Sequence, residues 1–253
     1  MTIPRYFPGK AFLAAGLLET GLLLTALDPG GTTVDFNLLK GPAETGSNEV
    51  NLLKDGDFES EQIDFDQRGS SWRSGCWVWN RNLKDKAHRK RITDGMIRVL
   101  EKGSGVGGSR CALIHTPDEL QKEQNKEGNP WMTSSIGQTV ALPDSEQPVK
   151  YTLNFKVKGK TGKSPGLNSL RVFVNFHDGL PGDREAKKLR KEINQAISLT
   201  ADYELRSVSF VAPPHTRRLG ISFTLYGQGK IYLDDAALTK IPVSEKVNVF
   251  VSP

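Results

Sequence analysis

Cysteines and short catalytic motifs are scarce in this sequence. Its 253 residues include two cysteines and four histidines, which do not have the spacing of a zinc site. No G-x-S-x-G, H-E-x-x-H or P-loop pattern occurs. The acidic residues are dispersed, so no local motif nominates the pair of carboxylates that a glycoside hydrolase needs. The sequence therefore favours a protein that is not an enzyme.

Long stretches with helical periodicity are also absent, whereas turn-forming residues are common. The 25 glycines and 14 prolines suit many short strands separated by turns. A chain of this length has room for one β domain of roughly 150–200 residues with flanking segments. Residues 183–197 are the one segment with helical propensity, and we expect an insertion or a short helix there.

Apolar and polar residues alternate along several segments. Tyr151, Leu153, Phe155 and Val157 alternate with polar residues, so one face of this strand is apolar. Further strands are expected at residues 96–100, 110–115, 136–142, 170–176, 208–210, 219–225 and 231–233. Many short strands with turns between them predict an all-β fold, a two-sheet β-sandwich.

The N-terminal residues resemble an export segment. Arg5 and Lys10 precede an apolar run at residues 11–27, which Glu19 and Thr20 interrupt. Residues 1–27 are therefore expected to be a signal peptide or a membrane anchor, and both readings stay open. Residues 28–50 have the composition of a linker, residues 51–241 form the sandwich, and residues 242–253 form a tail or edge strand. The protein is expected to be secreted, periplasmic or at the cell surface.

Two further features bear on partners and redox state. The net charge of +5 favours contact with an anionic partner, such as an acidic polysaccharide. The basic residues at 84–91 and 184–191 are interleaved with acidic ones, so we interpret them as solvated loops, and export argues against a nucleic-acid partner. Cys76 and Cys111 can form a disulfide in an exported protein, or they can be two buried thiols.

Four segments, taken in order, resemble the family 4/9 carbohydrate-binding modules. These segments are Asn51-Leu-Leu-Lys-Asp-Gly-Asp-Phe-Glu-Ser, Gly107-Gly-Ser-Arg-Cys-Ala-Leu-Ile, the stretch from Trp131 through Ile136-Gly-Gln-Thr-Val to Tyr151-Thr-Leu-Asn-Phe-Lys-Val-Lys-Gly, and Ile231-Tyr-Leu-Asp-Asp-Ala-Ala-Leu. The resemblance spans residues 51–241. It implies a galactose-binding-like jelly roll whose first strand lies in the opening segment.

The resemblance also implies a structural calcium ion where the first and last strands meet. Calcium takes carboxylate and backbone oxygens, so acidic residues from two chain ends suit it. Glu59 and Asp235 are the expected ligands, with Asp57 and Asp234 in reserve.

Aromatic residues beside amides and guanidinium groups are the candidates for sugar binding. If Trp77 and Trp79 lie on a strand, their side chains share one face. On an exposed face they form a platform on which a sugar can stack, and on an inward face they are core residues. On the strand at residues 170–177 the odd-numbered residues must point away from the core. We predict a shared concave face that binds ligand through Trp77, Trp79, Arg171, Phe173, Asn175 and Tyr226. Trp72 and Trp131 are expected to contribute from loops or to lie in the core.

The predicted function is thus that of an exported, monomeric, non-catalytic protein that binds a polysaccharide or oligosaccharide. Two alternatives remain at this stage. One is a protein-binding or adhesive surface domain, because a jelly roll does not dictate its ligand. The other is an accessory part of a glycoside hydrolase system.

Overall fold

Two antiparallel sheets of five strands carry the fold in the computed structural model of the chain, which describes residues 50–78, 86–126, 131–163, 168–189 and 192–241. The first sheet has the strand order β1-β4-β9-β6-β7, and the second sheet has the order β2-β3-β10-β5-β8. The strands are β1 (Arg73–Val78), β2 (Ile97–Lys102), β3 (Arg110–Thr116), β4 (Met132–Ala141), β5 (Val149–Thr161), β6 (Ser169–His177), β7 (Ile193–Ile197), β8 (Glu204–Ala212), β9 (Arg218–Tyr226) and β10 (Gly229–Lys240). The predicted all-β sandwich is confirmed.

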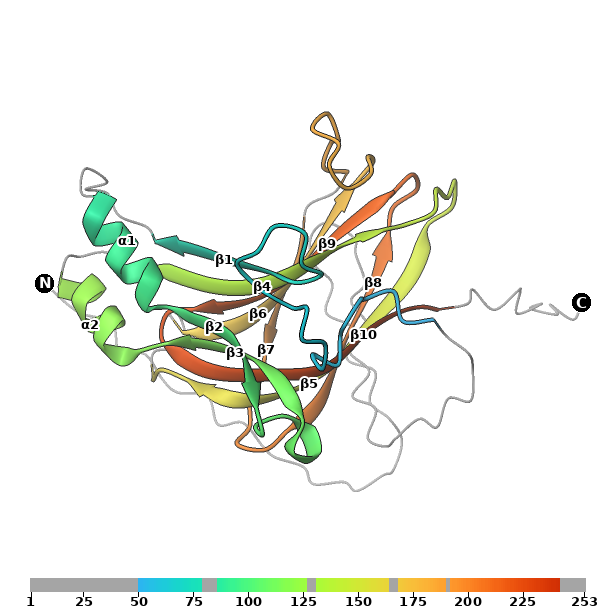
Figure 1. Cartoon of the computed structure of the whole chain (residues 1–253). Coiled ribbons are helices and arrows are strands. Elements are labelled where there is room, and N and C mark those ends of the chain that lie inside the picture. The colour runs from blue at the N-terminus through green and yellow to red at the C-terminus, as the bar shows by residue number, and fades with distance from the viewer. Residues whose placement is uncertain (1–49, 79–85, 127–130, 164–167, 190–191, 242–253) are drawn as a thin grey trace, which may run out of the picture. The chain divides into compact units, whose positions relative to one another are not determined.

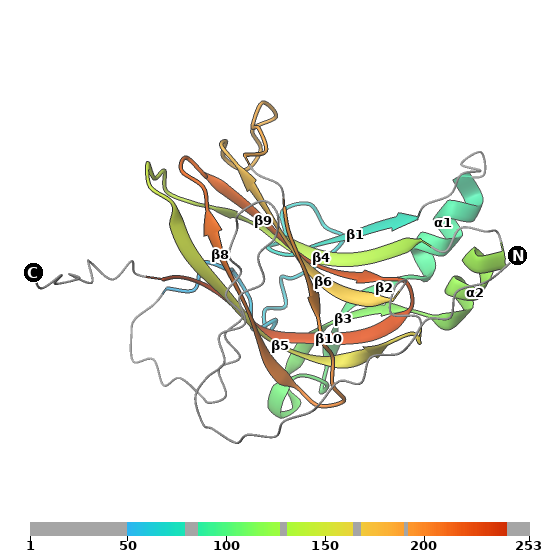
Figure 2. The same cartoon turned by 180° about the vertical axis from the view of Figure 1, so that it is seen from behind.

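The two sheets stack face to face, with β1 and β2 on one side of the sandwich and β7 and β8 on the other (Figures 1 and 2). Alternation along each strand places the apolar set between them. On β5, Tyr151, Leu153, Phe155 and Val157 are all buried, whereas the lysines between them are partly exposed. The segment before β1 closes the core with Trp72, which is fully buried.

Two short helices lie together at one end of the sandwich, α1 (Lys86–Gly95) and α2 (Asp118–Lys126) (Figures 1 and 2). Arg91 of α1 forms an ion pair with Glu123 of α2. Ile92 of α1 is buried against Met132 at the start of β4. In the part of the chain that the structure describes, no helix has the length and hydropathy needed to span a membrane.

The described part of residues 183–197 contains no helix, so the helical one of the two expected alternatives is wrong there. Their described part is a bend followed by the edge strand β7, which pairs with β6. Ile193 and Ile197 lie opposite Val174 and Leu170, and they pack against the main core. Pairing with an existing sheet therefore overrides the local helical propensity.

The opening segment does not form the expected first strand, although it is bound to the last one. The backbone N–H of Leu52 donates to the carbonyl of Leu238 at 2.9 Å, and the N–H of Ala236 donates to the carbonyl of Gly56 at 2.7 Å. The structure assigns no strand to residues 51–60. The predicted export segment at residues 1–27, the linker up to residue 49 and the tail at residues 242–253 lie outside the described residues.

Candidate functional site

The side chains predicted to bind ligand on β6 face outward from the first sheet. Leu170, Val172, Val174 and Phe176 are buried in the core. The alternate residues Arg171, Phe173 and Asn175 are partly exposed on the opposite face. This placement follows from the period of two residues along a strand.

Tyr226 of β9 joins these residues through the register of the sheet. Ser169 of β6 pairs with Tyr226, and Arg171 pairs with the neighbouring Thr224. The ring centroids of Phe173 and Tyr226 are 6.2 Å apart with the planes tilted by 34°, and the guanidinium carbon of Arg171 lies 5.7 Å from the centre of the Tyr226 ring. Arg171, Phe173 and Tyr226 form one contiguous surface, which we call the aromatic cluster.

Hydrogen bonds hold the guanidinium group of the aromatic cluster in place. Nη1 of Arg171 donates to Oδ1 of Asn194 at 3.0 Å, and its Nε donates to Oγ of Ser169 at 3.3 Å. Burial raises the pKa of the Tyr226 hydroxyl, so this hydroxyl is neutral at physiological pH and can donate or accept a hydrogen bond.

The tryptophans that the sequence suggests as possible ligand-binding residues do not share one location among the described residues. Trp77 of β1 pairs with Thr133 of β4, which in turn pairs with Tyr226, so all three lie on one face of the sheet. The Trp77 residue is 47% exposed. Trp79 lies outside the described residues. Trp72 is a core residue and Trp131 is 42% exposed, and neither lies within a strand of the first sheet.

Between Trp77 and the aromatic cluster, strands β4 and β9 carry small side chains on this face of the sheet. Four neighbouring residues on this face of β4 and β9 carry hydroxyl groups, and we call them the hydroxyl strip: Thr133, Ser135, Ser222 and Thr224, of which Thr224 is only 8% exposed. The hydroxyl oxygens of Ser222 and Thr224 are 2.9 Å apart. Sequence reasoning did not select these residues, because serine and threonine are common on any sheet and only the register places these four between aromatic side chains.

The outward positions on the described strands of the first sheet carry arginine but no carboxylate. Arg73, Arg171 and Arg218 all face this side. His177 lies beside Arg218, and burial together with Arg218 and Lys188 lowers its pKa below 6.5. The strand residues of this face are therefore positive at neutral pH without a contribution from this histidine, and Glu192, just before β7, is an acidic residue close enough to act on the Tyr226 hydroxyl.

Gly220 of β9 leaves room on this face, since a Cβ added there meets only the Cβ of Asn175 at 3.7 Å. We expect Gly220→Val to keep or slightly raise the melting temperature, because glycine within a strand costs about 0.5–1 kcal/mol. The new side chain stands beside Asn175, so binding of a ligand to this face is expected to weaken about tenfold. Affinity electrophoresis and thermal melting measure both effects. Ser209→Val on the second sheet is the control, and unchanged binding by the Gly220 variant would exclude contact at this position.

The expected calcium ligands are already engaged with other groups. Oε1 of Glu59 accepts the backbone N–H of Arg110 at 2.7 Å, and Oδ2 of Asp235 lies 2.9 Å from Nζ of Lys156. Asp234 is buried, and its carboxylate accepts hydrogen bonds from the N–H groups of Val106 and Asp235 at 2.8 Å each. Within the described ranges, no three acidic, histidine or cysteine residues form a metal-binding group.

A calcium ion takes about 6–8 oxygen ligands, and binding one here would require Glu59 and Asp235 to exchange their present partners for it. Calcium binding therefore remains a prediction of the sequence resemblance alone. From the Lys156–Asp235 pair we expect the melting temperature to be the same with and without a chelator. A lower melting temperature with chelator would show that calcium displaces Lys156 from Asp235.

The disulfide considered for Cys76 and Cys111 is absent, since both residues are free thiols. The reason is that Cys111 of β3 comes next to the core residue Ala112, so its side chain lies on the face of the second sheet that points away from Cys76 and β1 of the first sheet. Cys111 also contacts the backbone carbonyl of Glu101, and burial raises the pKa of its thiol.

Comparison with known proteins finds solved structures of low sequence identity. No family model matches the chain, and no curated protein matches it. Among solved structures, the enzymatically active domain of tailspike protein 4 from bacteriophage CBA120 is 15% identical with a TM-score of 0.49, and the match covers 76% of this chain and 21% of that one.

Two further matches are with carbohydrate-binding modules. TmCBM61, solved with β-1,4-galactotriose, is 16% identical with a TM-score of 0.40, and the match covers 76% of this chain and 99% of the module. The xylan-binding domain CBM22-1 of Paenibacillus barcinonensis Xyn10C is 10% identical with a TM-score of 0.38, and the match covers 74% and 92% of the two chains. The fold itself, two antiparallel five-stranded sheets, is the jelly-roll sandwich that the resemblance to carbohydrate-binding modules predicts.

Proposed function

We propose that this chain is a non-catalytic protein that binds a polysaccharide or oligosaccharide on the outer face of the first sheet. The observation that carries the proposal is the arrangement of the aromatic cluster, the hydroxyl strip and Trp77 side by side on one face. An outward Phe173 in contact with Tyr226 and next to Arg171 is unusual for an inert surface.

Each part of this face has a role that suits a sugar chain. The rings of Phe173 and Tyr226 offer apolar faces to the C–H groups of a sugar ring. Arg171 and Asn175 offer N–H donors to hydroxyl oxygens, and the hydroxyl strip can both donate and accept. Because the pairs Arg171–Asn194 and Ser222–Thr224 are already hydrogen-bonded, little side-chain entropy is lost when a ligand binds.

The same face argues against hydrolysis. A glycoside hydrolase places two carboxylates about 5–10 Å apart across the scissile bond. The outward positions of the described strands of the first sheet hold no aspartate or glutamate. We therefore propose binding without catalysis, as the sequence predicts.

Charge favours an acidic glycan among the candidate ligands. Arg73, Arg171 and Arg218 give the face a positive field, which raises the local concentration of a polyanion. The proposal also places the protein outside the cytoplasm, as a monomer that is secreted, periplasmic or held at the cell surface by residues 11–27. The location outside the cytoplasm and the anchoring rest on the sequence of the N-terminal segment alone.

Affinity electrophoresis of the full chain through gels with neutral or acidic polysaccharides tests the proposal. We expect retardation by at least one polysaccharide, and loss of retardation by an acidic one at 1 M salt, where the screening length falls to roughly 3 Å. Migration that no polysaccharide changes would contradict the proposal and would favour a protein-binding or adhesive domain.

A further inference from the structure

Arg98 points from an edge strand into the space between the two sheets. It lies on β2, where it pairs with Ile114 of β3, and Ile114 is fully buried in the main core. Residues opposite each other in an antiparallel pair share a face. Arg98 therefore occupies an inward position of the kind that apolar residues fill on the other strands.

The guanidinium group of Arg98 has few protein partners. Its Nη1 donates one long hydrogen bond of 3.4 Å to Oγ of Ser134, a fully buried residue of β4. Its Nε is buried and has no hydrogen-bond partner among the described residues, where no carboxylate forms an ion pair with this side chain either. Withdrawing an arginine from water without a full set of acceptors is costly. The guanidinium group of Arg98 therefore needs a hydrogen-bond acceptor that is not among the described residues.

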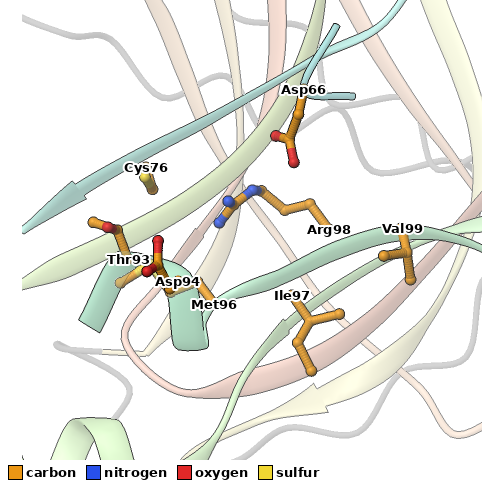
Figure 3. A pocket seen from close by; sticks show the side chains of 8 residues that line it. All are labelled: Asp66, Cys76, Thr93, Asp94, Met96, Ile97, Arg98 and Val99. Atoms are coloured by element: carbon orange, nitrogen blue, oxygen red, sulfur yellow. The ribbon is translucent and has the colours of Figure 1, made fainter. Parts of the chain in front are cut away.

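The space in front of this guanidinium is a cavity of about 480 Å³. It opens at the edge of the sandwich, between β1 and β2, and the C-terminal end of α1 borders it (Figures 1 and 3). Figure 3 shows the guanidinium end of Arg98 directed towards Asp66, Cys76 and Thr93. This volume lies within the range of about 300–1,000 Å³ that small-molecule sites have.

The groups around the cavity define the chemistry of its ligand. Arg98 supplies donors, and the carboxylates of Asp66 and Asp94 supply acceptors. Asp94 is paired with Lys90, so Asp66 and Arg98 leave no net charge to attract an anionic ligand, whereas a molecule with many hydroxyl groups satisfies both kinds of partner. The side chain of Met96 provides apolar surface for C–H groups, whereas the side chains of Ile97 and Val99 point to the other face of β2 (Figure 3).

We infer that this cavity, which we call the edge pocket, binds a neutral, hydroxyl-rich small molecule such as a monosaccharide or the end of a neutral sugar chain. In the bound complex Arg98 donates to hydroxyl oxygens of the ligand while Asp66 accepts from its hydroxyl groups. The inference does not depend on the proposed function, because the edge pocket lies between the sheets and the aromatic cluster lies on the outer face of one of them.

Cys76 provides a direct reporter for the edge pocket in the full chain. Its thiol is exposed and lines the cavity, and the only other thiol, Cys111, is fully buried. We expect neutral hexoses, pentoses or their disaccharides to slow the alkylation of Cys76 by iodoacetamide. Mass spectrometry measures the rate of this alkylation. Acetate and glucuronate serve as charged probes at the same concentrations.

Arg98→Met is expected to raise the sugar concentration that halves the rate of Cys76 alkylation about 10–100-fold. The reason is that the variant loses one hydrogen bond from a charged group to the sugar. Its melting temperature is expected to equal or exceed that of the parent, because methionine fills an inward position without a buried charge. The variant should keep its retention on polysaccharide gels. Arg184→Met, at an exposed loop arginine, is the matched control and should leave protection unchanged.

Four results would overturn the inference. The first is an alkylation rate that no neutral sugar changes, and the second is protection by the charged probes alone. The third is equal protection in the parent and in Arg98→Met. A melting temperature that falls in both Arg98→Met and Arg98→Lys would assign Arg98 a structural role and would also count against the pocket.

Discussion

Replacing Phe173 and Tyr226 together by alanine is expected to abolish retention by polysaccharide while the protein remains folded. Aromatic residues at the centre of a binding surface contribute about 2 kcal/mol or more each. Losing both therefore weakens binding roughly 1,000-fold. Both residues are partly exposed on the outer face, so the core beneath them keeps its packing.

A matched aromatic on the other sheet controls for this double variant. Tyr232 of β10 is partly exposed on the outer face of the second sheet, between Lys158 and Lys230. We expect Tyr232→Ala to leave retention unchanged. Equal retention by the double variant and the parent would move the binding site away from the aromatic cluster, and equal loss in both variants would indicate a general effect on the fold.

Trp72→Ala is expected to destabilise the protein by about 3–5 kcal/mol, as large-to-small changes of buried aromatic residues do. The Trp72 ring lies 4.9 Å from that of Phe58 and 6.2 Å from that of Phe223. Its indole N–H also donates to the carbonyls of Lys54 and Asp55, at 2.9 and 3.0 Å. Removing the side chain thus leaves a cavity and frees the opening segment.

Urea unfolding measures the effect of Trp72→Ala as a shift of the midpoint. The total stability of a domain is about 5–15 kcal/mol, so the variant is expected to lose a large share of it. Trp131→Ala is the control, because Trp131 is 42% exposed and its loss should leave the midpoint nearly unchanged. Similar midpoints for Trp72→Ala and the parent would contradict the anchoring role of this ring.

Strand positions could be predicted from the sequence wherever one face of a strand is buried. On β5, β6 and β9 every second residue is apolar, because the period of a strand matches the spacing of its core side. The same argument identified Phe173 as an outward residue. Helices α1 and α2 were not predicted, since both are short and polar, with few apolar positions to show a helical period.

The rest of the site depends on register, which a single sequence does not show. The hydroxyl strip exists because Thr133 and Ser135 lie opposite Tyr226 and Thr224, a pairing between strands far apart in sequence. The edge pocket likewise combines a residue before β1 with Arg98 of β2 and the end of α1. The expectation of a helix at residues 183–197 fails for a related reason. Pairing of β7 with β6 decides the conformation of this segment, and local composition does not show that pairing.

The position of β10 has a consequence for how the chain folds. This C-terminal strand lies in the middle of the second sheet, between β3 and β5, and it also receives the opening segment through Leu52 and Leu238, which are far apart in the sequence. Such long-range pairing slows folding to the range of about milliseconds to seconds. During synthesis β3 and β5 cannot be joined until the ribosome has released β10. The second sheet therefore closes only after the whole domain has been translated.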